Sequence, residues 1–324
     1  MPLPSSLQRA IEQEAGRYSA KDLNQAAAGL SAAYRAGEAE SGAFITSDLH
    51  RLAYAAVRLP ATFAAACAVM EEVRQRWSGP PLASLLDMGA GPGTAAWAAA
   101  AVFAELDSAT LFEADEGLIA LGKRLAQAGE QRLLAAAQWV RGDLRAPPAL
   151  APHDLVVSSY ALGELREEEA SEVVRAAWAL TGQVLVLLEP GTVRGFGLLR
   201  RLREHLIGAG GQVLAPCPHQ AACPLPAGDW CHFPARLERS RLHQRLKDGA
   251  LGYEDEKYAY VAVARQGGLA APARILRHPL RHAGHTELPL CTPAGLQRLT
   301  VTRSQKGAWK EARKAVWGDE WRGG

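Results

Sequence analysis

Cysteine is the residue type in this 324-residue sequence whose spacing most clearly suggests chemistry. The chain has five cysteines, and three of them crowd into the proline-rich segment LAPCPHQAACPLPAGDWCHF, with a fourth much later in LPLCTPAG. Four thiolates are the ligand set of structural zinc sites and of iron–sulfur clusters. The four candidate metal ligands are Cys217, Cys223, Cys231 and Cys291.

The spacing of these cysteines bears on which metal they would hold. Structural zinc sites usually carry tight C-x₂₋₄-C pairs, and this segment has none. Cysteines followed by proline, as in Cys217-Pro218 and Cys223-Pro224, occur in iron–sulfur loops. The spacing therefore favours an iron–sulfur cluster. Zinc and unligated thiols stay open as alternatives, with His219 and His232 as competing ligands.

A glycine loop, LLDMGAGPGT, marks a second candidate site. It places Asp87, Gly89, Gly91 and Gly93 directly after an apolar strand and before an alanine-rich helix. Glycines let the backbone turn tightly and approach a ligand without interference from a Cβ atom. A GxGxG loop after an acidic residue is typical of S-adenosylmethionine (SAM) methyltransferases, whereas a dinucleotide site reads GxGxxG.

Three further residues are expected to line the same pocket, because each stands at the end of a predicted strand. Glu113, in LFEAD, is placed to accept the two ribose hydroxyls of SAM, and Asp143, in RGDL, to reach the adenine amine. Ser158 ends the fourth strand, on the side where the reaction would occur. Together with the glycine loop, these residues predict a SAM-binding pocket.

The sequence assigns no catalytic residue. The segment after the fourth strand, SSYALGEL, lacks the Asn/Asp-Pro-Pro-aromatic loop of many amine methyltransferases. No cysteine lies between Cys67 and Cys217, so a thiolate nucleophile is absent from this part of the chain. Glu164 and Glu189 are the nearest candidate acid/base groups. Transfer of a methyl group by this domain is therefore a hypothesis to which the sequence assigns no catalytic residue.

The elements that must position these residues alternate between strand and helix. Apolar strands are expected in PLASLLDM, SATLFEAD, QWVRGDL, HDLVVSSY and QVLVLLEP, most of them followed by a helical pattern. Repeated βα units of this kind predict a doubly wound, mostly parallel α/β sheet of the Rossmann-like SAM methyltransferase class. We expect N-terminal helices in residues 1–77, the methyltransferase-like domain in 78–211, and a small mixed cysteine/iron–sulfur unit in 212–324.

Charge is unevenly distributed along the chain. From His232 to the end there are 17 Lys and Arg against 9 Asp and Glu, although the whole chain carries only +2. A basic C-terminal third on an acidic body suggests a module that faces a polyanion. The apolar runs do not predict a membrane span, and the N-terminus does not read as a signal peptide. We expect a cytoplasmic protein, monomeric as far as the sequence indicates.

The chain resembles a known family of methyltransferase-like small-ribosomal-subunit assembly factors, the Rsm22 family. The resemblance rests on RLPATF, LLDMGAGPGTAAWAA, DLVVSSYALGEL, VLLEPGT, VLAPCPH, CPL, DWCHF, EDEKYAYVAVAR, LCTPAG and ARKAVWGDEW, in this order. It implies a 4Fe–4S cluster held by the four cysteines named above, a SAM-type pocket at Asp87–Gly93, and binding to small-subunit rRNA during ribosome assembly. A bacterial member is expected.

The basic C-terminal residues then gain a physical role as an rRNA-binding surface. The expected RNA-facing residues are Arg274, Arg277, Arg281, Arg303, Lys306, Lys310, Arg313 and Lys314. The rival hypothesis is a conventional SAM-dependent methyltransferase of a small molecule or protein, with a structural zinc site. Iron and zinc analysis would discriminate the two.

Overall fold

Five apolar segments form the parallel strands that the sequence predicts. In the computed structural model, which describes residues 1–36, 45–147, 149–247 and 251–323, each of these strands follows the previous one through a helical connection or a loop. All five pair in parallel, in the order β3-β2-β1-β4-β5. Their bounds are β1 Ser84–Met88, β2 Ser108–Glu113, β3 Gln138–Arg141, β4 His153–Ser159 and β5 Thr181–Pro190.

The sheet continues beyond β5 with strands from later in the chain. β8 (Tyr253–Ala264) inserts antiparallel between β5 and β6 (Gln212–Ala215), and its first half pairs with β7 (Phe233–Glu238). The predicted boundary between the methyltransferase-like domain and the C-terminal unit, at residue 212, therefore lies too early in the chain, because β6, β7 and β8 belong to the main sheet. It assigned the segment KYAYVAVAR to the C-terminal unit, whereas seven consecutive residues of β8, Tyr258–Ala264, are buried inside the main sheet.

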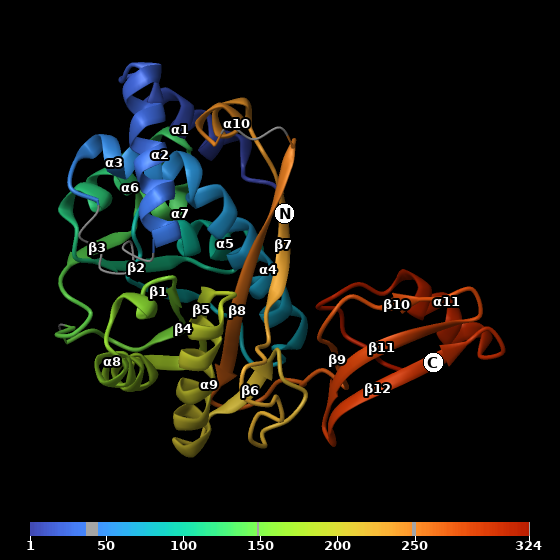
Figure 1. The fold of residues 1–324 in the computed structure, drawn as a ribbon. Helices are drawn as coiled ribbons and strands as arrows, with labels where there is room; N and C mark the ends of the chain where they lie inside the picture. Colours follow the sequence, from blue (N-terminus) through green and yellow to red (C-terminus); the bar gives the residue numbers. More distant parts are fainter. Residues whose placement is uncertain (37–44, 148, 248–250, 324) are drawn as a thin grey trace.

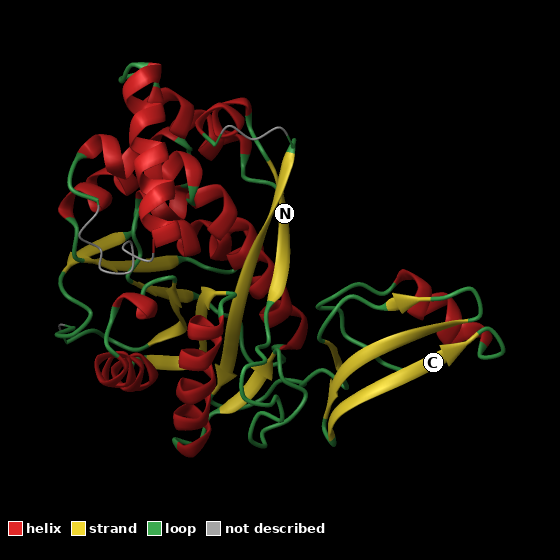
Figure 2. Ribbon diagram, in the orientation of Figure 1, coloured by secondary structure: helices red, strands yellow, loops and turns green. Residues whose placement is uncertain are grey.

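Helices cover both faces of this sheet, as the red and yellow elements of Figure 2 show. One face packs in a single core against α4 (Leu59–Arg76), α5 (Thr94–Val102) and α6 (Glu116–Ala128). The other face packs against α8 (Glu167–Ala179) and α9 (Val193–Gly208). The short elements are α7 (Arg132–Ala135), the 3₁₀ turn η2 (Leu162–Glu164) and α10 (Arg241–Leu246). This doubly wound, mixed sheet is the Rossmann-like class that the sequence predicts.

The N-terminal helices lie over the first of these faces (Figure 1). They are α1 (Ser5–Ala15), α2 (Ala20–Ala36) and α3 (Asp48–Val57), and Ser47 caps α3 by accepting a hydrogen bond from the backbone N–H of His50 at 3.2 Å. Pro60 stands in the first turn of α4, where proline is tolerated, and the axes of α3 and α4 differ by 49°. Among the described residues no single helix is long and apolar enough to cross a membrane. The bent pair α3–α4 reaches that length and apolar composition only when the two helices are taken together.

A smaller unit stands beside the α/β body (Figure 1). It contains β9 (Arg274–Ile275), β10 (Leu280–Arg281), β11 (His285–Thr292), β12 (Gly295–Thr302) and α11 (Lys306–Lys314). Its own core is formed by one face of the β11–β12 hairpin, where Leu288 and Val301 are buried together with Ala312 of α11. The four-stranded sheet pairs in the order β10-β11-β12, with β9 also on β11.

Candidate functional site

The glycine loop joins β1 to α5 at the carboxyl edge of the parallel strands, where doubly wound sheets bind their ligands. Gly89, Gly91 and Gly93 all have positive φ, between 55° and 88°. A Cβ atom on Gly89 would lie 2.5 Å from the Cβ of Ala161, whereas one on Gly91 would meet nothing within 4 Å. The loop is thus packed tightly at its first glycine and open at its second.

A cavity of about 370 Å³ lies against this loop, at the carboxyl ends of β1, β2 and β4. Of the predicted SAM-binding residues, five line it: Asp87, Gly89, Gly91, Glu113 and Asp143. Gly93 and Ser158 do not. Gly93 instead packs beneath the loop against Leu111, and Ser158 is buried, so that its neighbour Ser159 lines the cavity.

Two acidic side chains hold the loop in shape. Glu113 accepts hydrogen bonds from the backbone N–H of Gly91 at 2.7 Å and from that of Asp115 at 2.8 Å, and burial raises its pKa. Asp87 accepts one from the N–H of Ala96 at 3.1 Å, and burial raises its pKa to about 7. In this conformation the carboxylate of Glu113 therefore organises the loop as well as facing the cavity.

Asp143 has a different environment from the one that its predicted role requires. Its exposed carboxylate forms a forked ion pair with Arg145, with the guanidinium Nη2 2.5 Å from Oδ2 and Nε 2.9 Å from Oδ1. This partner lowers the pKa of Asp143 to about 2. A ligand that used the carboxylate would have to compete with Arg145.

A second cavity of about 750 Å³ adjoins the first and shares Tyr160 and Glu164 with it. Tyr160 has φ of 58°, a conformation unfavourable for a bulky side chain, and its hydroxyl donates to Glu256 at 3.3 Å. Burial raises the pKa of Glu164 to about 7 and that of Glu189 to about 8. These are the two acid/base candidates of the sequence, and both line this cleft.

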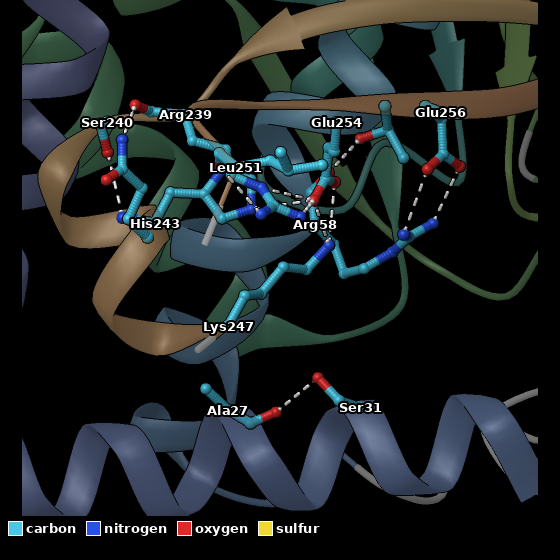
Figure 3. A network of polar contacts seen from close by, with 12 residues as sticks. Ala27, Ser31, Arg58, Arg239, Ser240, His243, Lys247, Leu251, Glu254 and Glu256 are labelled. Carbon is cyan, nitrogen blue, oxygen red and sulfur yellow. Dashed lines mark hydrogen bonds and ion pairs between the residues drawn. The ribbon is translucent and has the colours of Figure 1, made fainter. Parts of the chain in front are cut away.

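Ion pairs join the walls of the cleft to the β7–β8 ribbon. Arg58, between α3 and α4, faces Glu256 of β8 with a shortest N–O distance of 3.1 Å (Figure 3). Glu254 accepts from Lys247 at 2.8 Å and from Arg239 at 2.7 Å in the same view. The first pair fastens the ribbon to the junction of α3 and α4, and the other two fasten it to the ends of α10.

The four predicted metal ligands surround a third cavity, of about 40 Å³, at the junction of the α/β body and the C-terminal unit. Cys217 follows β6, Cys223 and Cys231 belong to the loop before β7, and Cys291 lies near the end of β11. The sequence therefore grouped residues that the fold does bring together. Of the two competing histidines, His219 lines the cavity, with Nε2 3.5 Å from Sγ of Cys291. His232 does not line it and stacks on Trp230.

Two arginines of α9 complete the wall of this cysteine cavity. Arg200 donates to the carbonyl oxygens of Cys223 at 2.9 Å and Leu225 at 3.2 Å. Arg203 is 3% exposed and donates from Nη2 to the carbonyl of His219 at 2.7 Å. Its Nε and Nη1 are buried without a partner among the described residues. Both arginines were missed from the sequence, although their i, i+3 spacing puts them on one face of a helix next to the cysteine loop.

The four cysteines suit a cluster with one metal atom for each thiolate better than a single metal ion. Burial, with the other cysteines contributing, raises the pKa of the Cys231 and Cys291 thiols, that of Cys291 to about 12. A single Zn²⁺ with Zn–S bonds of about 2.3 Å would hold its sulfurs about 3.8 Å apart. No three of the four Sγ atoms lie within 4.8 Å of one another in the described chain. A cubane instead bonds each thiolate to a different iron, so it does not require the sulfurs to converge on one ion, and the buried N–H groups of Arg203 are donors that suit an anionic group.

The predicted RNA-facing residues divide into buried and exposed ones. Arg274 is 2% exposed, and its guanidinium pairs with Glu72 of α4 at 2.6 Å, so its prediction as an RNA-facing residue is wrong. Arg277 is half-buried and bonds to Asp229. Arg281 is exposed, although its guanidinium donates to backbone carbonyls of residues 313 and 315. The predicted residues that remain exposed on β12 and α11 or beside them are Arg303, Lys306, Lys310, Arg313 and Lys314.

Comparison with known proteins places this architecture in a family. The family model described as "Mitochondrial small ribosomal subunit Rsm22" matches residues 48–322. The human mitochondrial ribosome assembly protein METTL17 is 29% identical over 286 residues, which cover 83% of this chain and 61% of the human protein. The mitochondrial ribosome assembly protein RSM22 of Saccharomyces cerevisiae is 26% identical, over 34% of this chain and 28% of the yeast protein. The chain thus spans less than two thirds of the length of either relative.

Among solved structures the chain is similar to magnesium protoporphyrin IX methyltransferase from Synechocystis. The identity is 14% and the TM-score 0.41, over 63% of this chain and 78% of that one. A putative RNA methyltransferase from Pyrococcus horikoshii gives 12% identity and a TM-score of 0.42, over 64% of this chain and 84% of that one. Similarity this low adds nothing to the strand order already described. The match to the family model is different, because it spans most of the sequence, and the chain belongs to the Rsm22 family.

Proposed function

We propose that this protein is an assembly factor of the small ribosomal subunit that binds rRNA through its C-terminal unit. A 4Fe–4S cluster on Cys217, Cys223, Cys231 and Cys291 stabilises that unit, and the glycine-loop cavity binds SAM. The observation that carries the proposal is the convergence of the four cysteines on one cavity at the junction of the two parts of the chain.

The cluster would have a structural effect that follows from where its ligands lie. When bound, it supplies iron–thiolate bonds that join the cysteine loop to β11. The protein's own residues prepare this arrangement: Arg200 donates to the carbonyls of the loop, and Arg203 lines the cavity with its guanidinium buried. Loss of the cluster is expected to disorder the C-terminal unit while the α/β body stays folded.

Binding to rRNA is supported by charge and by the family. The exposed basic residues of β12 and α11 occupy the C-terminal unit, and the similar human protein is named a ribosome assembly protein. Each phosphate that a basic side chain neutralises releases counterions, so the affinity should fall steeply with salt. A Lys306→Ala/Lys310→Ala variant should weaken binding of a small-subunit rRNA fragment. It should also lower the salt slope by up to about 2 units, about 0.9 for each phosphate that is no longer neutralised.

The cluster is tested by purifying the full chain anaerobically and measuring iron, zinc and the visible spectrum. We expect a brown protein with about four irons, lost in Cys217→Ser. Cys67→Ala is the matched control, because Cys67 is buried in α4, outside the cysteine cavity, and this variant should keep the iron. A colourless protein with one zinc and no iron would overturn the cluster and favour the rival hypothesis, a conventional methyltransferase with a structural zinc site.

Methyl transfer is the second candidate function, favoured by the cleft of about 750 Å³ that adjoins the glycine-loop cavity. Glu164 and Glu189 reach it with raised pKa values, so both can hold a proton near neutral pH. Incubation with labelled SAM and small-subunit rRNA tests it. Label on the RNA that disappears in Glu189→Gln would support an enzyme. SAM binding without transfer would leave SAM as a bound ligand of an assembly factor.

A further inference from the structure

Two histidines and a glutamate meet at the tip of the C-terminal unit, away from both sites described above. The ligand atoms of His282, His285 and Glu287 all lie within 4.8 Å of one another, and in the described part of the chain no other three His, Cys, Asp or Glu residues do so. Nε2 of His285 is 3.6 Å from Oε1 of Glu287, and Nε2 of His282 is 3.9 Å from the same oxygen. The two imidazole rings stack with centroids 4.4 Å apart.

The hairpin explains why these three side chains share a face. β10 pairs with β11 through Leu280 opposite Glu287, and the N–H of His282 donates to the carbonyl of His285 at 2.9 Å. The two histidines therefore stand opposite each other across the turn. Glu287 follows His285 by two residues, which returns its side chain to the same face of β11. Thr286, between them, is fully buried on the other face.

A fourth residue orients the carboxylate. Arg298, on β12, donates to Oε2 of Glu287 at 3.1 Å, which leaves Oε1 directed toward both imidazoles. Metal sites commonly hold a ligating carboxylate in this way by a hydrogen bond to its second oxygen. The site is also separate from the cysteines, since the six residue steps along extended β11 from His285 to Cys291 span about 20 Å.

We propose that His282, His285 and Glu287 form a binding site for a divalent transition-metal ion such as Zn²⁺. Two imidazoles and a carboxylate suit zinc and its neighbours, whereas Mg²⁺ and Ca²⁺ take oxygen ligands. The three side chains are partly exposed, so the rings can rotate to close on an ion and water can fill the remaining positions. The ion links β10 to β11 at the turn whose Gly284 carbonyl accepts from the backbone N–H of Arg303.

The test is calorimetric titration of Zn²⁺ into the full chain without an affinity tag. The four cysteines are left with whatever metal they carry after purification. Wild type should bind one Zn²⁺ with a micromolar or tighter Kd. His282→Ala and His285→Ala should each weaken the zinc affinity by at least about 100-fold, because losing even a residue that only supports a ligand lowers metal affinity by about 10–100-fold. Arg298→Leu should weaken it by about 10-fold. His278→Ala is the control: His278 is another exposed histidine of the same unit, outside the trio.

A spectroscopic readout separates this site from zinc taken up by cysteines. Cu²⁺ added to wild type should give an electron paramagnetic resonance spectrum with hyperfine splitting from two nitrogens, reduced in either histidine variant and kept in His278→Ala. Circular dichroism checks that the variants remain folded. Equal zinc affinity in wild type, His282→Ala and His285→Ala would overturn the site, and so would a wild-type Kd of about 1 mM or weaker.

Discussion

Replacing Arg274 with methionine is expected to detach the C-terminal unit from the α/β body. The guanidinium of Arg274 donates to both carboxylate oxygens of Glu72, at 2.6 and 3.1 Å, and to the carbonyls of Pro216 at 3.2 Å and Gly318 at 2.7 Å. One buried side chain thus ties α4, the segment just before Cys217 and the C-terminal end of the chain. Methionine keeps much of the apolar stem and removes all four hydrogen bonds.

The free-energy cost of this substitution can be worked out from the polar groups that lose their partner, which are Glu72 and two backbone carbonyls. Removing one partner of a buried ion pair typically costs about 3–5 kcal/mol. Glu72 keeps Arg76, whose Nε lies 2.9 Å from Oε2, which lowers the cost toward about 3 kcal/mol. The two carbonyls that lose their donor raise it again by about 1 kcal/mol. A loss of about 3–4 kcal/mol increases the population of the opened C-terminal unit about 100- to 1,000-fold.

Limited proteolysis under native conditions measures that population, because cleavage follows the open form when opening and closing are fast. The C-terminal unit of Arg274→Met should be cut about 100 to 1,000 times faster than that of wild type. Arg303→Met is the matched control, because Arg303 is exposed, and it should be cut at the wild-type rate. Cleavage of Arg274→Met at the wild-type rate would refute the reasoning. So would an intact, folded Arg274→Met protein with a reduced salt slope for rRNA, since that would restore Arg274 as an RNA contact.

Two other substitutions test the pocket and the buried carboxyls. Gly91→Ala should weaken SAM binding more than its control, Gly210→Ala. Both glycines have positive φ and open space around them, so both alanines are strained, but only Gly91 lines the cavity. Equal SAM affinities of the two variants would contradict this prediction. Glu189 holds its proton in the folded state up to about pH 8, whereas an unfolded glutamate releases it near pH 4.3. This one group should therefore lower the free energy of unfolding by about 1.4 kcal/mol per pH unit between these values. Urea denaturation of Glu189→Gln from pH 5 to 8 should show a shallower fall than wild type, and parallel curves would exclude this role.

The parallel strands and the glycine loop could be predicted because their signals are local. Each strand is a short apolar run, and the loop lies next to the strand that positions it. β8 shows the limit of this reasoning. Its segment KYAYVAVAR has the apolar, β-branched and aromatic composition of a strand, but nothing within it indicates that its partners are β5 and β6, which are far away in the chain. β6 and β7 were missed because the first has four residues and the second contains Pro234.

The basic residues show the same limit at the level of single side chains. Arg274 and Arg303 look alike in a sequence, and charge alone predicts that both are exposed. The structure buries Arg274 because Glu72, 202 positions earlier, supplies the compensating carboxylate. The cysteines could be grouped without the fold, since four of them in a chain with five already suggest one site. Which arginines would serve that site depended on the packing of α9 against the loop.

α9 lies between the two candidate sites, with one face toward the cleft and another toward the cysteine cavity. Arg194, Gly195 and Leu198 line the cleft beside the glycine-loop cavity. Another face of the helix lines the cysteine cavity, with residues at positions i, i+3, i+4 and i+7: Phe196, Leu199, Arg200 and Arg203.

The cysteine loop also reaches the start of this helix. Trp230, next to Cys231, donates from Nε1 to the carbonyl of Gly191 at 2.9 Å, in the turn between β5 and α9. The loop is therefore fastened to the turn by Trp230 and along the helix by Arg200 and Arg203. The cysteine cavity and the cleft share no lining residue, but one helix, α9, contributes a wall to each of them.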